Sequence, residues 1–172
     1  GGVYRYDDAS RFDAIGRAGA PITVESYPGE WAIWDGSHLS ASAWEYPVIR
    51  GNYYAMRRFE VRRMPLQGIQ IAGSHNLIAG VNAHDNKLSG IHVHGSYDLP
   101  YGAKGSYNVI QDSTVTNNSD AGSSSGEYAD GGNADGISIS SGEGNRVVRC
   151  LADHNSDDGI DSWRSTNTVV QD

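Results

Sequence analysis

A repeat of about 22 residues constrains the fold of this chain more than any other feature of its sequence. A Gly-Ile pair recurs in four segments, beginning at Gly68, Gly90, Gly136 and Gly159. The first two glycines lie 22 residues apart, and the same interval separates Asn145 from Asn167 in later repeats. Self-similarity with a period of roughly 20 to 50 residues is typical of a solenoid, in which each repeat packs on the next.

Within each repeat, apolar and polar residues alternate over short runs. In the third repeat, Ile110, Ser113 and Val115 are predicted to point inward, and Gln111 and Thr114 outward. A period of two indicates strands rather than helices. Short strands in a coil of this length predict a parallel β-helix, whose equivalent residues stack about 4.8 Å apart. Two inward columns are expected, one of Ile69, Ile91, Ile137 and Ile160 and one of Phe59, Val81, Ser113 and Cys150.

The repeats predict one all-β domain over residues 1–172. Two stretches, 97–106 and 120–133, read as insertions on the outside of single coils. Both ends of the chain interrupt a repeat, so we expect a β-helix that is incomplete at both ends and a fragment of a longer chain. Residues 8–19 are expected to include a short helix.

Four aspartates come together once the repeats are stacked. Asp135 and Asp158 each precede the glycine of a Gly-Ile pair, which places their Cα atoms roughly 5 Å apart in one column. Asp157 is adjacent, and Asp161 follows the turn. Carboxylates this close repel one another, and a hard divalent cation removes the conflict. The cluster predicts a calcium site; the alternatives are a solvated acidic turn and aspartates that bond to backbone amides.

The sequence around this cluster resembles the family nine polysaccharide lyases, which are secreted pectate lyases and their relatives. The similarity is carried by residues 133–136 (NADG), 144–150 (GNRVVRC) and 155–161 (NSDDGID), and it runs from about Pro21 to the end. It implies a right-handed parallel β-helix and a secreted protein. It also implies the ligands of one Ca²⁺ ion, which are Asp135, Asp157, Asp158 and Asp161.

The activity that the resemblance implies is calcium-dependent β-elimination on an acidic, pectate-like polysaccharide. Ca²⁺ would stabilise the charge that grows as the C5 proton leaves, and a basic side chain would remove that proton. The family uses a lysine on a later coil, whereas the only lysines here, Lys87 and Lys104, precede the acidic coil. Arg164 is a poor substitute base because its pKa exceeds about 12, and pairing with a substrate carboxylate suits it better. We therefore expect this length of chain to be inactive by itself.

The charge of the chain limits its partners. The formal net charge is -8, with 21 acidic and 13 basic residues, which argues against a nucleic-acid partner. No apolar run approaches the roughly 18 residues that span a membrane. An acidic polysaccharide is the expected partner, provided that a cation or local arginines reverse the field. A monomer is expected unless the ends of the solenoid associate.

Two groups outside the acidic cluster were weighed for function. His92 and His94 share one face of a strand, and we interpret them as surface residues because no third zinc ligand is evident. The alternative places them along a sugar-binding groove. Three asparagines share one position and are interpreted as a structural row of stacked amides: Asn86, Asn118 and Asn155.

Two other functions remain open. In a polygalacturonase-like inverting glycoside hydrolase, the clustered aspartates would act as acid and base; the later G-H-G and R-I-K motifs of that family are not seen. A non-catalytic carbohydrate-binding β-helix is the second alternative. A uronate epimerase is disfavoured because its D-P-H-[DE] motif is missing.

Overall fold

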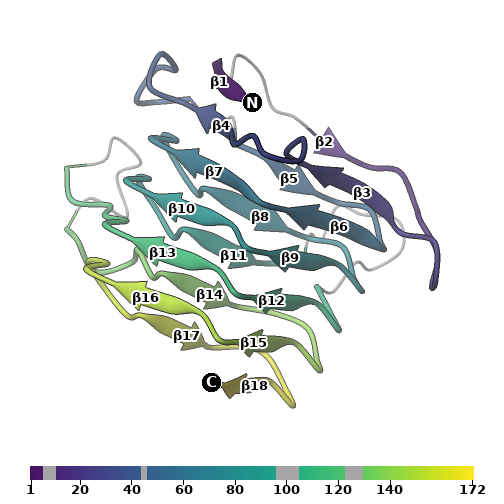
Figure 1. Ribbon diagram of the computed structural model, residues 1–172. Helices are drawn as coiled ribbons and strands as arrows, with labels where there is room; N and C mark the ends of the chain where they lie inside the picture. The colour runs from purple at the N-terminus through teal and green to yellow at the C-terminus, as the bar shows by residue number, and fades with distance from the viewer. Residues whose placement is uncertain (6–10, 44–45, 96–104, 123–129) are drawn as a thin grey trace.

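The computed structural model describes residues 1–5, 11–43, 46–95, 105–122 and 130–172. These residues form 18 strands in three six-stranded parallel sheets (Figure 1). Sheet I contains β1 (Gly2–Arg5), β4 (Ala32–Asp35), β7 (Phe59–Arg62), β10 (Asn82–His84), β13 (Thr114–Thr116) and β16 (Leu151–Asp153). Sheet II contains β2 (Arg11–Phe12), β5 (Val48–Ile49), β8 (Ile69–Ile71), β11 (Ile91–Val93), β14 (Ile137–Ile139) and β17 (Ile160–Ser162). Sheet III contains β3 (Ile22–Glu25), β6 (Tyr54–Arg57), β9 (Leu77–Ala79), β12 (Val109–Gln111), β15 (Arg146–Val148) and β18 (Val169–Gln171).

The chain visits the three sheets in turn, so each strand pairs in parallel with the strand three places later. The predicted parallel β-helix is therefore confirmed. In sheet II, Ile91 pairs with Ile69 on one side and with Ile137 on the other, and Ile137 pairs with Ile160. The predicted isoleucine column thus forms in full. The second predicted column also forms, because the register of β7, β10, β13 and β16 aligns the residues that precede or begin these strands.

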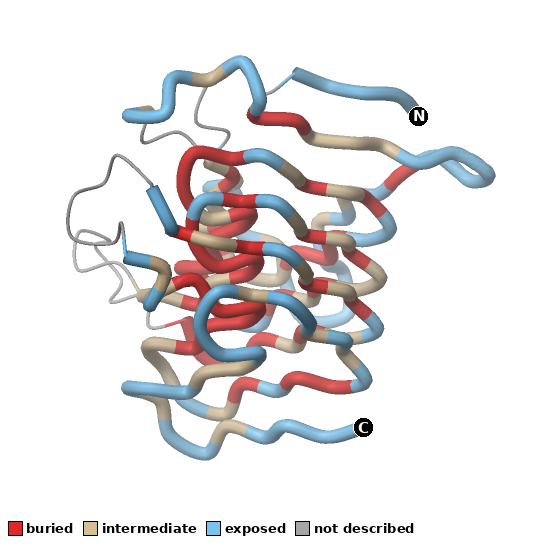
Figure 2. The backbone as a smooth tube through the Cα atoms, turned by 90° about the vertical axis from the view of Figure 1, so that its left-hand side faces the viewer, coloured by how far each residue is buried: buried red, intermediate tan, exposed pale blue. Residues whose placement is uncertain are grey.

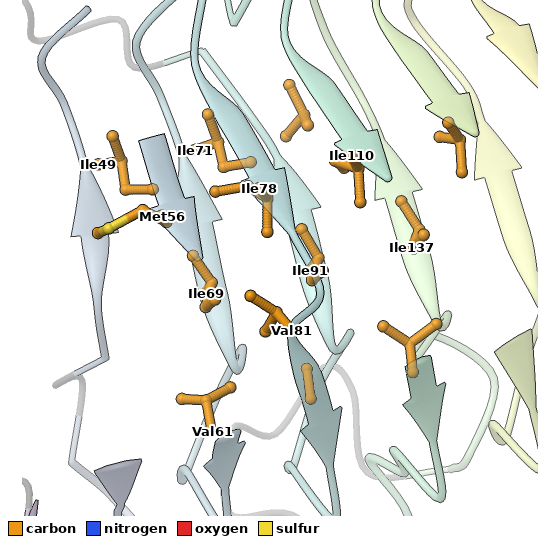
Figure 3. Close-up of a cluster of buried hydrophobic side chains, with 14 of the residues drawn as sticks. Ile49, Met56, Val61, Ile69, Ile71, Ile78, Val81, Ile91, Ile110 and Ile137 are labelled. Carbon is orange, nitrogen blue, oxygen red and sulfur yellow. The ribbon is translucent and has the colours of Figure 1, made fainter. Parts of the chain in front are cut away.

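The core lies inside the coils, where identical or similar side chains stack along the solenoid (Figure 3). Ile49 and Ile71 pair between β5 and β8, and Met56 and Ile78 pair between β6 and β9; all four are fully buried. Complete burial of such a side chain stabilises the fold by about 1.5–3 kcal/mol. Figure 2 shows the buried stretches concentrated in the middle coils, whereas the strands at the two termini are exposed.

Asparagine rows join successive coils at their turns. Nδ2 of Asn86 donates to Oδ1 of Asn118 at 2.8 Å, and Nδ2 of Asn118 donates to Oδ1 of Asn155 at 2.9 Å. This confirms the predicted row of paired amides. A second row includes Asn108, whose Nδ2 donates to Oδ1 of Asn145 at 3.2 Å. These rows hold the turns of neighbouring coils at a constant position relative to one another. They therefore also set where the outward side chains that follow those turns lie.

The predicted helix over residues 8–19 is wrong for the part that the structure describes. Residues 11–12 form strand β2, and Arg17 and Ala20 form an isolated bridge in an otherwise irregular segment. The parallel pairing of Arg11 with Val48 and of Phe12 with Ile49 adds this segment to sheet II, so tertiary pairing overrides local preference. Among the described residues there is no helix that could cross a membrane.

Candidate functional site

The outer face of sheet II carries a pocket of ≈ 700 Å³. Four outward side chains, one from each of four neighbouring strands, form its central row: Gln70, His92, Ser138 and Asp161. The same strands bear the isoleucine column on their inner face. The remaining lining residues come from the flanking turns and coils, namely Tyr46, Leu66, Gln67, Leu88, Ser89, His94, Asn133, Asp135, Ser140, Asp157 and Trp163.

One end of the pocket, formed by Asp135, Asp157 and Asp161, is here called the acidic end. Asp135 is only 6% exposed. Its burial raises the pKa of the carboxyl to about 6, and the negative charges of Asp161 and Asp157 raise it further. Hydrogen bonds from the Ser138 side chain and the Asp158 backbone act in the opposite direction and lower it. The pKa of Asp157 is also raised, by desolvation first and by neighbouring carboxylates second. The acidic end therefore concentrates negative charge, with no lysine or arginine among the described lining residues.

The structure brings together three of the four predicted calcium ligands in this pocket, and it places Asp158 beside them. Asp158 donates its N–H to Oδ1 of Asp135 at 3.3 Å, and its carbonyl accepts from the N–H of Gly136 at 2.9 Å. The Asp158 side chain is exposed and is not part of the pocket lining. The predicted stacking of Asp158 on Asp135 is thus confirmed, while the role of either as a ligand stays a prediction.

The donor set suits a hard cation, because it consists of carboxylate oxygens at a site of unopposed negative charge. As the side chains stand, no group of three or more His, Cys, Asp or Glu within the described ranges is arranged to hold a metal ion. Asp157 and Asp158 are exposed, and exposed side chains change rotamer on the picosecond to nanosecond timescale. Binding of an ion therefore requires these side chains to move.

A fifth aspartate, Asp120, supports the acidic end through hydrogen bonds to the turns that carry its carboxylates. Asp120 is fully buried. Its Oδ1 accepts a hydrogen bond from Oγ of Ser156 at 3.1 Å, and its Oδ2 accepts from Nδ2 of Asn133 at 3.4 Å. Ser156 directly precedes Asp157, and Asn133 lies two residues before Asp135. Asp120 therefore ties together the two turns, on successive coils, that present these pocket carboxylates.

Sequence reasoning missed Asp120, although a signal was present. Asp120 follows Asn118 by two residues, just as Asp157 follows Asn155 by two. Because Asn118 and Asn155 are neighbours in the asparagine row, Asp120 and Asp157 occupy equivalent positions in successive coils. The insertion after Asp120, of which residues 123–129 lie outside the described ranges, separates it in sequence from the turn that it supports.

The other end of the pocket, formed by Gln67, Gln70, His92, His94 and Ser140, is here called the imidazole end. Nε2 of His92 lies 2.7 Å from Oγ of Ser140, and Nδ1 of His94 lies 3.1 Å from the same oxygen. Nδ1 of His92 lies 3.3 Å from Nε2 of Gln67. Burial, followed by the charge of His94, lowers the pKa of His92 to about 3, and burial lowers the pKa of His94. Both imidazoles are therefore neutral near pH 7.

The interpretation of His92 and His94 as surface residues is wrong. Both are half-buried and line the pocket, because residues from other coils build walls around them. Arg164 is not part of the lining; its guanidinium Cζ lies 4.1 Å from the ring centroid of Trp163, which is a lining residue. A cation–π contact of this kind positions Arg164 against Trp163 and gives no support to a role as base. Lys87 is exposed outside the lining, and Lys104 lies outside the described residues.

A solenoid of three parallel sheets, with a carboxylate-lined pocket on the outer face of one of them, places the chain in the class of parallel β-helix proteins. The chain belongs to the family of Pel9A-like right-handed β-helix regions, whose family model matches residues 1–172. The right-handed fold and the resemblance to family nine lyases, both predicted from the sequence, are thus confirmed.

Pectate lyases are among the proteins that this chain resembles. Pectate lyase L of Dickeya dadantii (strain 3937) is 34% identical over 163 residues, which are 92% of this chain and 35% of that protein. Pectate lyase L of Dickeya chrysanthemi is 32% identical over the same lengths. The crystal structure of pectate lyase Pel9A superimposes with a TM-score of 0.80 and 30% identity, covering 98% of this chain and 42% of that one. The chain thus spans about a third of the length of the curated relatives.

Proposed function

We propose that this chain carries the cation-binding and substrate-binding half of a calcium-dependent lyase, which cleaves acidic, pectate-like uronate polysaccharides by β-elimination. The observation that carries the proposal is the concentration of negative charge at the acidic end of the pocket, where the pKa values of Asp135 and Asp157 are raised. The similarity to pectate lyases supports the substrate class. A polymer of this kind is met outside the cell, so the chain is expected to be secreted.

Asp135, Asp157, Asp158 and Asp161 are the residues that would hold Ca²⁺. When bound, the ion supplies positive charge for a uronate carboxylate and for the enolate-like charge that forms as the C5 proton leaves. Asp120 keeps the two ligand-bearing turns together. This arrangement would bind and orient a uronate unit beside the acidic end.

Removal of the C5 proton needs a general base close to the substrate. The described residues that line the pocket include no lysine or arginine. His92 is a weak base, because its pKa is lowered to about 3. We therefore expect the 172-residue chain to bind a polyuronate without cleaving it, and to form no unsaturated product that absorbs near 235 nm.

Calorimetric titration of the chain with CaCl₂, after dialysis against EDTA, tests the proposal. One Ca²⁺ should bind, and Asp161→Asn should weaken its binding by about 100-fold or more, since changes even to residues that merely support metal ligands typically cost 10–100-fold. Asp153→Asn is the matched control, because it removes one charge from an exposed residue of the neighbouring strand β16. Absence of calcium binding, or equal affinities in the two variants, would contradict the proposal.

A second candidate is an inverting glycoside hydrolase, favoured by a single observation. The pKa of Asp135 is raised to about 6 beside other carboxylates, which is the environment that a general acid requires. Product analysis separates the two functions. Saturated reducing ends released from polygalacturonate in the presence of EDTA would identify a hydrolase and would exclude the calcium-dependent lyase.

A further inference from the structure

The pocket is chemically unequal along its length. All three of its acidic side chains lie at one end, and no lysine or arginine lines any described part of it. The imidazole end instead combines neutral polar groups with apolar neighbours, since Leu66 and Leu88 also line the pocket. A polysaccharide lying across these strands would therefore meet two different environments on consecutive units.

The hydrogen-bond pattern at the imidazole end leaves groups available for a ligand. An amide N–H can only donate, so Nδ1 of His92 accepts from Gln67 and Nε2 of His92 donates to Oγ of Ser140. The Ser140 hydroxyl then donates to Nδ1 of His94 or to the carbonyl of Val93, at 3.1 and 3.3 Å. In either case, Nε2 of His94 makes no hydrogen bond within the described part of the chain. One amide hydrogen of Gln70 is also left, because its Nε2 has a single, long contact with the carbonyl of His94 at 3.5 Å.

A uronate carboxylate would be poorly held at this end. Both imidazoles are neutral near pH 7 because burial lowers their pKa values, and the other polar groups are an amide and a hydroxyl. A buried charge without a counter-ion is costly. Sugar hydroxyl groups, in contrast, match donors and acceptors that are neutral, and an ester methyl or deoxysugar methyl matches Leu66 and Leu88.

We propose that the imidazole end is a subsite for an uncharged sugar unit, held through its hydroxyl groups by His94 and Gln70, next to a uronate unit at the acidic end. This inference rests on the proposed function and sharpens it. The preferred polymer is one in which charged and uncharged units are neighbours. Two sources share this chemistry: a methyl-esterified uronate unit and a neutral deoxysugar that alternates with uronate.

The test is calorimetric binding of three oligosaccharides to the 172-residue chain in saturating CaCl₂. The first is an unesterified pentagalacturonate, the second is its counterpart with methyl esters on alternate units, and the third alternates a neutral deoxysugar with uronate. We expect the second or the third to bind about tenfold more tightly than the first, because an uncompensated charge at the imidazole end costs more than a hydrogen bond contributes. Whichever of them binds more tightly identifies the source of the uncharged unit.

Three variants assign the preference to the imidazole end. His94→Ala should reduce the affinity for the preferred oligosaccharide about tenfold and leave the affinity for Ca²⁺ unchanged. Gln70→Lys places a cation on the outer face of β8 and should reverse the preference toward the unesterified oligosaccharide. His154→Gln is the matched control, because His154 is an exposed histidine beyond β16 and should change nothing. Thermal unfolding of each variant verifies that it is folded.

The outcomes separate this inference from the proposed function. Calcium-dependent binding of all three oligosaccharides with equal affinity, or tightest binding of the unesterified one, would overturn the subsite and leave the proposed function standing. Failure of every oligosaccharide to bind in the presence of Ca²⁺ would overturn both. A preference that persists in Gln70→Lys would also overturn the subsite.

Discussion

The two faces of sheet II carry unlike side chains. On their inner face, strands β8, β11, β14 and β17 stack one column of four isoleucines, Ile69, Ile91, Ile137 and Ile160. The outer face of the same strands carries four different side chains, Gln70, His92, Ser138 and Asp161. One backbone register positions both rows.

The difference shows how a solenoid separates stability from function. An inner position must match the shape of the coils above and below it, because interiors are close-packed. An outer position in the pocket makes polar contacts with its neighbours and leaves space for a ligand, so its shape is less constrained. The inner row can therefore stay uniform while the outer row changes from amide to imidazole to hydroxyl to carboxylate, and this change gives the pocket its two unlike ends.

The largest expected effect comes from adjacent residues on opposite faces of β14. Ile137→Ala should lower the free energy of unfolding by about 3–4 kcal/mol, because it removes a fully buried side chain from the isoleucine column. Ser138→Ala should lower it by about 1 kcal/mol, because it removes no core packing and only one side-chain hydrogen bond, to Asp135. Urea denaturation followed by circular dichroism measures both. Losses of equal size would contradict the assignment of stability to the inner face.

The second effect has the opposite sign and depends on pH. The pKa of Asp135 is raised to about 6 from 3.8, so the folded state binds its proton more tightly than the unfolded state does. The resulting penalty is absent below about pH 4, grows between pH 4 and pH 6, and is complete above pH 6. A shift of about two pH units corresponds to about 3 kcal/mol. Asp135→Asn should therefore stabilise the chain by up to this amount at pH 7.5 in EDTA.

The same substitution should remove the response to calcium. Added CaCl₂ should raise the melting temperature of the unaltered chain, since a ligand that binds only the folded state stabilises it, and should leave that of Asp135→Asn unchanged. Unfolding at pH 3.5 provides the internal control, because both proteins should then be equally stable. A variant that is less stable than the unaltered chain at pH 7.5 in EDTA would show that Asp135 is not under electrostatic strain.

The inner face could be predicted from the sequence because it depends on period alone. Once Gly68 and Gly90 set the interval, the alternation of apolar residues assigned Ile69 and Ile91 to one column without further information. The stacking of Asp158 on Asp135 followed from the Gly-Ile pairs that begin at Gly136 and Gly159, since each aspartate directly precedes one of these glycines. These positions lie within the repeat, where each coil has the same path.

The pocket could be predicted only in part, because burial there depends on residues outside the repeat. Tyr46 and Trp163 belong to the walls, and no period relates them to the histidines that they help to enclose. His92 and His94 were therefore assigned to the surface. The prediction of a helix within residues 8–19 was wrong for a related reason. The pairing of β2 with β5 lies in the irregular first part of the chain, where no repeat indicates it.

The smallest expected effect concerns Asp120, which is buried like an inner-face residue but contacts residues of the pocket. It is as buried as the core isoleucines, yet its hydrogen bonds to Asn133 and Ser156 hold the turns of the pocket. Asp120→Asn keeps Oδ1 as the acceptor for Ser156 and for the backbone N–H of Asn133 at 3.5 Å. It replaces Oδ2 with an amide N–H₂ that faces the Asn133 side-chain amide, so the tie between the turns is weakened. We expect the Kd for Ca²⁺ to rise about tenfold, the lower end of the range for groups that orient metal ligands.

A matched variant separates this positioning role from the loss of one negative charge. Asp112→Asn removes an exposed carboxylate that pairs with Arg149 and does not line the pocket, so its calcium affinity should equal that of the unaltered chain. Calcium titration and urea unfolding in EDTA should be measured on both variants. If Asp120→Asn lowers the free energy of unfolding but leaves the Kd for Ca²⁺ unchanged, then Asp120 belongs with the inner face and contributes only to stability. If Asp120→Asn raises the Kd for Ca²⁺ while Asp112→Asn does not, then one buried carboxylate contributes both to the packing of the coils and to the geometry of the site. Stability and function are then not fully separated in this solenoid.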